Sequence, residues 1–107
     1  WGMDDDLRGT WTITELLPNG IRPQTAEITF EDHRLYFYAG CNRAMGSYTI
    51  DGHTLTAGPV ALTMMYCPDM SAEQHLCRVL AEPLDVSFDG DTLTATGPVG
   101  GFTARRA

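Results

Sequence analysis

The sequence GCNRAMGSYTIDG, residues 40–52, decides the fold. Its Asp-Gly pair is typical of a tight β-hairpin turn, because such turns need positive φ values that these two residue types tolerate. The stretches on either side of the pair are rich in Thr, Tyr, Ile and Leu, as strands are. We therefore expect a β-hairpin here, with Cys41 and Asn42 at the corner that leads into it.

Two further stretches have the same hairpin pattern. EDH at residues 31–33 and DGD at residues 89–91 each separate two short strand-like runs. The sequences IDGHTLTA, residues 50–57, and FDGDTLTA, residues 88–95, are nearly copies of each other. We expect about eight short strands, at residues 7–17, 26–30, 34–38, 47–50, 54–57, 85–88, 92–96 and 100–104.

One helix is expected, from about Ser71 to Glu82. Ser71 is a favourable N-cap, and Glu73 or Gln74 can return a hydrogen bond in capping-box fashion. An apolar stripe with the spacing of a helix face follows, and a proline ends the pattern. The predicted fold class is therefore α+β, with antiparallel strands in a curved sheet or partly closed barrel and this helix packed on it.

The composition is that of an ordinary globular domain. A chain of 107 residues is enough for one core, so we expect a single domain over residues 1–107. Its 14 acidic and 7 basic side chains give a net charge of −7, which argues against a nucleic-acid partner because phosphate binding needs clustered Lys and Arg. No apolar run approaches the roughly 20 residues that span a bilayer. Residues 1–6, with three consecutive aspartates, are expected to form a flexible leader.

Several stretches, in their order along the chain, resemble the motifs of one family. They are LRGTW at residues 7–11, GCNR at 40–43, GSYTIDG at 46–52, TMMYCP at 63–68 and DGDTL at 89–93. On these residues the chain resembles the META domain, also called HslJ-like after the heat-shock protein HslJ. The resemblance covers nearly the whole chain.

The resemblance implies an extracytoplasmic domain of a bacterial envelope lipoprotein or secreted protein, built mostly of antiparallel strands. Because the molecular activity of such domains is generally unassigned, we expect a non-enzymatic binding or structural role, linked to stress tolerance. The implied partner is an envelope protein or a fused module, and we expect a monomer without cofactors. Two positions depart from the family pattern. Ala44-Met45 replaces a large aromatic, which the core tolerates if Met45 fills the space, and Met64 replaces an arginine.

The expected interaction surface combines the two cysteine motifs. It comprises Gly40, Cys41, Asn42, Arg43, Met45, Thr63, Met65 and Cys67. If these motifs lie side by side, a disulfide between Cys41 and Cys67 would stabilise the fold by roughly 3 kcal/mol. The alternative is two buried thiols that act as small hydrophobes. Cys77, on the helix, is expected to be a core thiol.

Two neighbouring features allow more than one interpretation. Asn42 is expected to bond its own backbone in an Asx turn rather than a ligand, and Arg43 can pair with a carboxylate. Four methionines and a tyrosine form the zone richest in sulfur and aromatic groups, which is either core filling or an adaptable binding surface. They are Met45, Met64, Met65, Tyr66 and Met70.

Neither a metal site nor a catalytic site is expected. The cysteines and histidines stand alone rather than in the closely spaced pairs that zinc sites use. A Cys-His hydrolase needs both groups within hydrogen-bond reach, and His75 is eight residues after Cys67. The aspartates at Asp51, Asp89 and Asp91 are turn formers.

Two other functions remain open. The first is a carrier that holds a small apolar ligand in a barrel cavity, which requires an unfilled interior. The second is a thiol-based redox protein, which requires an exposed cysteine with a lowered pKa. The side chains expected to fill the interior are Trp11, Phe30, Tyr36, Leu55, Phe88 and Phe102.

Overall fold

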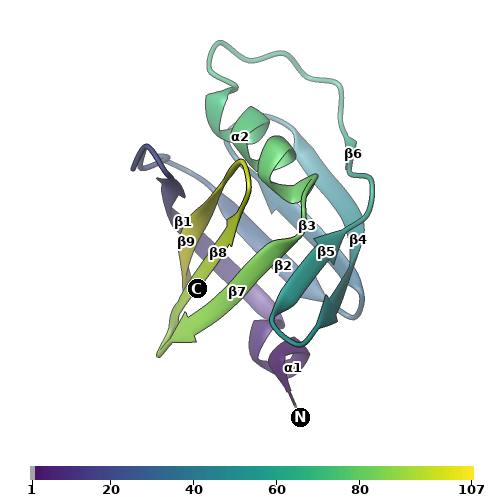
Figure 1. Ribbon diagram of the computed structural model, residues 1–107. Coiled ribbons are helices and arrows are strands. Elements are labelled where there is room, and N and C mark those ends of the chain that lie inside the picture. Colours follow the sequence, from purple (N-terminus) through teal and green to yellow (C-terminus); the bar gives the residue numbers. More distant parts are fainter. Residues whose placement is uncertain (1) are drawn as a thin grey trace.

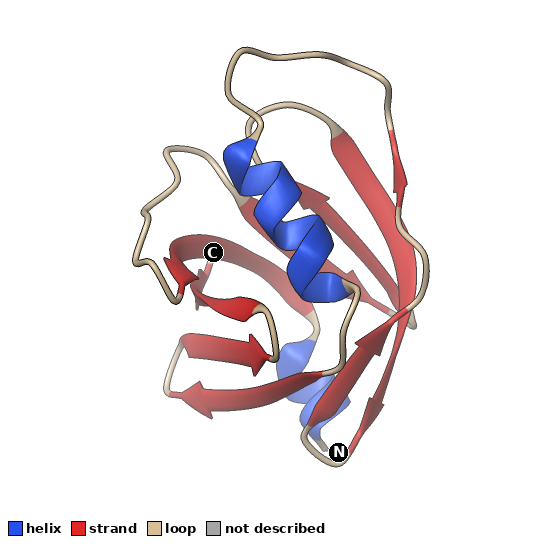
Figure 2. Cartoon of the chain, turned by 45° about the horizontal axis from the view of Figure 1, so that its top comes forward, coloured by secondary structure: helices blue, strands red, loops and turns tan. Residues whose placement is uncertain are grey.

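The structure is a computed structural model that describes residues 2–107. The predicted fold class is confirmed, because antiparallel strands form a barrel on which one main helix packs (Figure 1 and Figure 2). The helices are α1 (Met3–Leu7) and α2 (Ser71–Leu80). The strands are β1 (Gly9–Leu17), β2 (Glu27–Glu31), β3 (Arg34–Tyr38), β4 (Arg43–Asp51), β5 (Thr54–Ala57), β6 (Ala61–Leu62), β7 (Leu84–Asp89), β8 (Thr92–Gly97) and β9 (Gly100–Arg106).

Eight of the strands form a closed ring. Neighbours follow the order β3-β2-β1-β9-β8-β7-β5-β4, and β4 pairs with β3 to close the ring. The ninth strand, β6, continues the line of β5 along the same side of β4, and within residues 2–107 no strand pairs with its other edge. The long connection between β5 and β7 carries α2 across one end of the barrel, whereas α1 lies at the other end (Figure 1).

The three predicted hairpins are present. In the two near-copies the turn glycines have the positive φ values that the sequence indicated, 61° at Gly52 and 59° at Gly90. The hairpin at residues 31–33 instead places His33 at φ 58°, an uncommon value for a residue with a side chain. All three turns are exposed and lie at the end of the barrel where α1 packs.

Helix α2 begins at Ser71, as predicted, and ends at Leu80, two residues before the predicted end. Its apolar stripe, which includes Leu76 and Val79, is completely buried against the barrel core. Ser71 is the first helical residue, so Met70 rather than Ser71 occupies the N-cap position. Neither helix in the described part of the chain is long and apolar enough to cross a membrane.

The expected flexible leader is instead a short helix, apart from Trp1, which lies outside the described residues. Helix α1 ends in Leu7, whose side chain is fully buried. The Trp11 indole donates a hydrogen bond to the Leu7 carbonyl at 2.8 Å. The Arg106 guanidinium lies 4.2 Å from the centre of the Trp11 ring and donates to the carbonyls of Asp6 and Arg8. Contacts with the barrel therefore order an acidic segment whose composition alone suggested a solvated tail.

Side chains fill the interior of the barrel. Trp11, Phe30, Leu55 and Phe102 are buried there as predicted. Tyr36 points outward from β3 and is partly exposed, because strand alternation places it beside buried Leu35 and Phe37. Phe88 is also partly exposed and packs on Trp11, with 5.8 Å between the ring centres. The interior that a carrier would need is occupied by this packed core.

Candidate functional site

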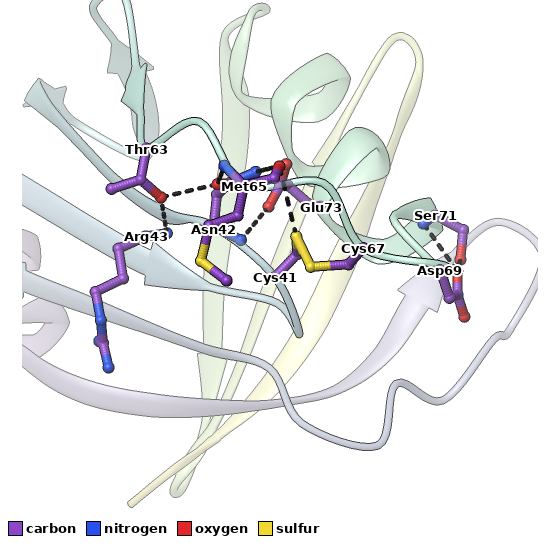
Figure 3. The surroundings of a disulfide bond; sticks show 9 residues. All are labelled: Cys41, Asn42, Arg43, Thr63, Met65, Cys67, Asp69, Ser71 and Glu73. Carbon is purple, nitrogen blue, oxygen red and sulfur yellow. Dashed lines mark hydrogen bonds between the residues drawn. A yellow bond between two sulfur atoms is a disulfide. The ribbon is translucent and has the colours of Figure 1, made fainter.

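The two cysteine motifs meet at one corner of the molecule. Cys41 lies in the turn between β3 and β4, and Cys67 lies in the segment that leads into α2. Their Cα atoms are 5.9 Å apart and a disulfide joins them (Figure 3). Of the two alternatives for this pair, the structure therefore contains the disulfide. We call residues 40–43 and 63–70 together the disulfide corner.

Asn42 holds the two halves of the corner together. Its side chain is only 3% exposed, and its Oδ1 accepts hydrogen bonds from Thr63 Oγ1 at 2.8 Å and the Met65 amide at 2.7 Å. Its Nδ2 donates to the Met65 carbonyl at 3.1 Å. The expected Asx turn is absent. Instead, the Asn42 side-chain amide makes long-range hydrogen bonds, because it both donates to and accepts from the backbone of Met65 (Figure 3).

Glu73 completes this buried network from the first turn of α2. It is 3% exposed, and its carboxylate accepts from the Asn42 amide at 2.7 Å and from Asn42 Nδ2 at 3.0 Å. The position also suits a negative charge, because the partial charge at a helix N-terminus is positive. The expected capping box is wrong, since the Glu73 side chain reaches across to the β3–β4 turn rather than back along its own helix.

Thr63 and Arg43 extend the network along the strand pair. The Arg43 amide donates to Thr63 Oγ1 at 3.1 Å, and the Thr63 amide donates to the Arg43 carbonyl at 3.1 Å. The Arg43 side chain leaves the network and lies over the Tyr38 ring, 5.4 Å from its centre. The expected pairing of Arg43 with a carboxylate is absent from residues 2–107 at a distance of 4 Å or less.

The methionine-rich zone is a surface rather than core filling, except for the half-buried Met70. Met64 is 97% exposed, Tyr66 90%, Met65 61% and Met45 47%. Met45 therefore does not take the place of a buried aromatic side chain. It lies on the outside of β4, opposite Tyr36 of β3, because its neighbour Ala44 occupies the inward position.

The corner is bordered by the start of α2. Gly40 has a φ of 97°, which favours glycine at the turn beside Cys41. Asp69 accepts hydrogen bonds from the Ser71 amide at 3.0 Å and the Ser71 hydroxyl at 2.7 Å, and these bonds lower the pKa of its carboxyl group. A surface cleft of about 430 Å³ lies between these residues and the loop at residues 21–25.

The structure brings seven of the eight expected site residues into this corner. Met45 is the exception, because it lies along β4 on the outer face of the barrel. Glu73 is the residue that sequence reasoning missed as a site residue. A signal was present, since an acidic residue stood in the first turn of the only long helix, but local capping explained it without a distant partner.

The remaining thiol and imidazole groups lie elsewhere. Cys77 is a free, partly buried thiol, and burial followed by the charge of Glu73 raises its pKa, which disfavours the thiolate. The buried His75 ring has Nε2 3.0 Å from the Gly101 carbonyl. Within residues 2–107 no group of three or more His, Cys, Asp or Glu side chains is placed to hold a metal ion.

Comparison with known proteins places this architecture in a family. Two structures determined by NMR share the fold. One has a TM-score of 0.81 and 19% identity over 98% of this chain and 95% of its own. The other, from Burkholderia xenovorans, has a TM-score of 0.78 and 18% identity over 97% of this chain and 86% of its own. No curated protein matches the chain. The family model of the META domain matches residues 5–105, so the chain belongs to the META domain family.

Proposed function

We propose that this domain is a non-enzymatic binding module that works outside the cytoplasm and contacts a partner protein through the disulfide corner. The observation that supports the proposal is a contrast within residues 63–67. The backbone is fixed by a disulfide and by Asn42, yet Met64, Met65 and Tyr66 project into solvent. Ordering a segment costs roughly 1–2 kcal/mol per residue, and this segment offsets little of that cost by burying its own large side chains.

The types of exposed side chain also support protein binding. Tyr, Met and Arg are enriched at the centres of protein interfaces, where an apolar body and a polar tip are both useful. Methionine adapts its shape to a partner because it is unbranched and polarisable. Fixing the backbone in advance reduces the entropy that binding must overcome.

The disulfide supports a location in an oxidising compartment. Disulfides persist in secreted, periplasmic and surface proteins and are rare in the reducing cytosol. Together with the family resemblance, this favours a bacterial envelope or secreted protein, with an envelope protein or a fused module as partner and a role in stress tolerance. A redox enzyme is less favoured, because two cysteines are oxidised to each other and the third has a raised pKa.

Photo-crosslinking tests the proposal. A benzoylphenylalanine at position 66 would be introduced into the full-length protein in its host, with the same group at exposed His53 on a hairpin at the other end of the barrel as the matched control. We expect a discrete adduct with an envelope protein from position 66 and none from position 53. The adduct should weaken when Met64 is changed to Ser.

Two results would overturn the proposal. The first is the absence of an adduct from position 66, or the same adducts from positions 66 and 53. The second concerns location: if Cys41 and Cys67 are alkylated in intact cells without a reductant, the disulfide does not form there.

A further inference from the structure

Strand β6 has an edge that pairs with no other strand among the described residues. β6 pairs with the side of β4 that faces away from β3, in line with the end of β5, and no strand pairs with its other side among the described residues. Proteins usually protect such edges with charged residues or proline. Residues 60–66, VALTMMY, contain neither a charge nor a proline, so the protection here is limited to the short length of β6, two residues, and to Pro59 just before them.

The backbone of Leu62 points toward this free side. The amide and carbonyl groups of successive strand residues point in opposite directions. Because the Thr63 amide donates to the Arg43 carbonyl on β4, the groups of Leu62 face away from β4. The Leu62 side chain and its neighbour Ala61 are also exposed. An added strand would find a donor, an acceptor and apolar contacts at this position.

The outer face beside this edge is aromatic and cationic. Tyr36 lies opposite Met45, and Tyr38 lies opposite Arg43, on the outward side of β3 and β4. Arg34 Nη2 lies 3.5 Å from the Met45 sulfur atom. A shallow hollow of about 170 Å³ on the same face is lined in part by both tyrosines and Arg43.

The charges of this face are not neutralised within the described chain. Neither Arg34 nor Arg43 has a carboxylate within 4 Å, although the protein has twice as many acidic as basic side chains. On the neighbouring strand β2, Glu31 lies directly opposite Arg34 and Glu27 lies opposite Tyr38, whereas Arg43 on β4 has no acidic residue opposite it on β3. Two copies of this chain joined edge to edge would bring two such cationic faces together, and each copy has a net charge of −7. The charge pattern therefore favours an acidic partner over a second copy.

We propose that β6 accepts an extended, acidic segment of a partner protein as an additional strand. Strand addition is an established mode of peptide recognition, in which the backbone gives affinity and alternate side chains give specificity. The new strand would lie about 10 Å from β4, which is two strand spacings. To meet a Glu or Asp of the added strand, the exposed Arg43 side chain would leave the Tyr38 ring, over which it lies in the free protein, and turn across Thr63. The inference rests on the proposed function, because residues 63–66 continue directly from β6 into the disulfide corner.

The test uses peptides of defined composition and backbone amide NMR spectra of the protein. The probe is a seven-residue peptide with alternating Glu and Val, capped at both ends. One control peptide has Lys in place of Glu, and a second has the Glu peptide sequence with N-methyl groups on alternate residues. We expect the Glu peptide to shift the amide signals of residues 43–45 and 60–63, and both controls to bind at least about tenfold more weakly.

Charge-reversal variants test whether the effect on peptide binding falls with distance from the added strand. Arg43→Glu should weaken binding of the Glu peptide about tenfold, and Arg34→Glu, one strand farther away, should weaken it less. Arg105→Glu on β9 is the matched control, since it makes the same charge change at an exposed position on another strand and should leave binding unchanged.

The inference is overturned if the Lys peptide binds as well as the Glu peptide, or if no signals of residues 60–63 shift. It is also overturned if those signals shift with protein concentration alone, because the edge then pairs with a second copy. If position 66 forms its crosslink equally well in the Arg43→Glu variant, the acidic strand is wrong but protein binding by the corner stands.

Discussion

The two ends of the barrel are ordered by different means. At the α1 end, polar contacts hold a helix that closes the core: Leu7 is buried, and Trp11 and Arg106 bind the helix carbonyls. At the α2 end, a disulfide and the Asn42–Glu73 network hold a segment whose large side chains remain in solvent.

The contacts at the two ends of the barrel have different consequences for the protein. Contacts at the α1 end stabilise the packed interior, so their loss should affect the whole fold. Contacts at the α2 end have two consequences, because they add to stability and also fix the conformation of an exposed surface. Substitutions at the α1 end should therefore disturb the stability of the whole fold, and those at the α2 end should also disturb the exposed surface.

Replacement of Trp11 by Ala should have the largest effect. The side chain is fully buried, lies against Phe88 and holds α1 through its indole nitrogen. We expect a loss of about 4 kcal/mol in the free energy of unfolding, measured by urea denaturation. Trp11→Phe should lose less. A loss below about 1 kcal/mol for Trp11→Ala would show that the α1 end does not depend on this anchor.

Removal of the disulfide by the double substitution Cys41→Ala and Cys67→Ala should cause the second-largest loss of stability. The bond links residues 26 apart in the sequence, so its loss should cost about 3 kcal/mol through the greater freedom of the unfolded chain. The barrel should still fold. Crosslinking from position 66 should decrease, whereas the contacts that hold α1 should change less. Unchanged denaturation curves would contradict this account of the α2 end.

Asn42→Ala should cost about 2 kcal/mol, because it leaves the buried Glu73 carboxylate with fewer donors. Asn42→Asp keeps the shape but places a second carboxylate beside the first. It should therefore be more destabilising near pH 7 than near pH 4, where protonation relieves the repulsion. Equal stability of Asn42→Asp at both pH values would argue against a charged Glu73 in the network.

Tyr48→Phe should have the smallest effect near neutral pH, about 1 kcal/mol. The Tyr48 hydroxyl lies 2.8 Å from Asp4 Oδ1 and 2.9 Å from the Glu31 carbonyl, and burial followed by the hydrogen bond to Asp4 raises its pKa.

The pH dependence has a definite sign. Above about pH 10 the phenol loses its proton in the unfolded state but keeps it in the folded state, so the wild type loses stability as pH rises. The advantage of the wild type over Tyr48→Phe should shrink there. A difference that stays constant from pH 7 to pH 11 would contradict the raised pKa.

Local sequence patterns predicted the parts of the fold that depend on local chemistry. The Asp-Gly turns at Gly52 and Gly90 are determined by the turn residues themselves, and the spacing of apolar residues predicted α2. The pairing of β1 with β9 was not predictable from local patterns, because these strands lie at nearly opposite ends of the chain. Helix α1 was missed for a related reason, since the contacts that order its aspartates come from Arg106 and Tyr48.

In the candidate site, too, local patterns were predictable and long-range contacts were not. The family motifs indicated which segments meet, but Asn42 was assigned a local turn and Glu73 a local cap because both residues commonly serve those purposes. In the structure Asn42 and Glu73 bond each other across 31 residues of sequence, and Asn42 also bonds Thr63 and Met65. The exposure of Met64 and Tyr66 was equally inaccessible, because apolar residues more often fill a core than leave it.

Amide hydrogen exchange at residues 63–66 tests most directly whether the α2 end is a fixed but exposed surface. The Thr63 and Met65 amides donate hydrogen bonds to Arg43 and Asn42, whereas Met64 and Tyr66 lie in solvent. We predict that the Thr63 and Met65 amides exchange on the order of 100-fold more slowly than those of Met64 and Tyr66, and that reduction of the disulfide removes much of the difference. If all four amides exchange at the same fast rate in the oxidised protein, the segment is not held in place and the account is contradicted.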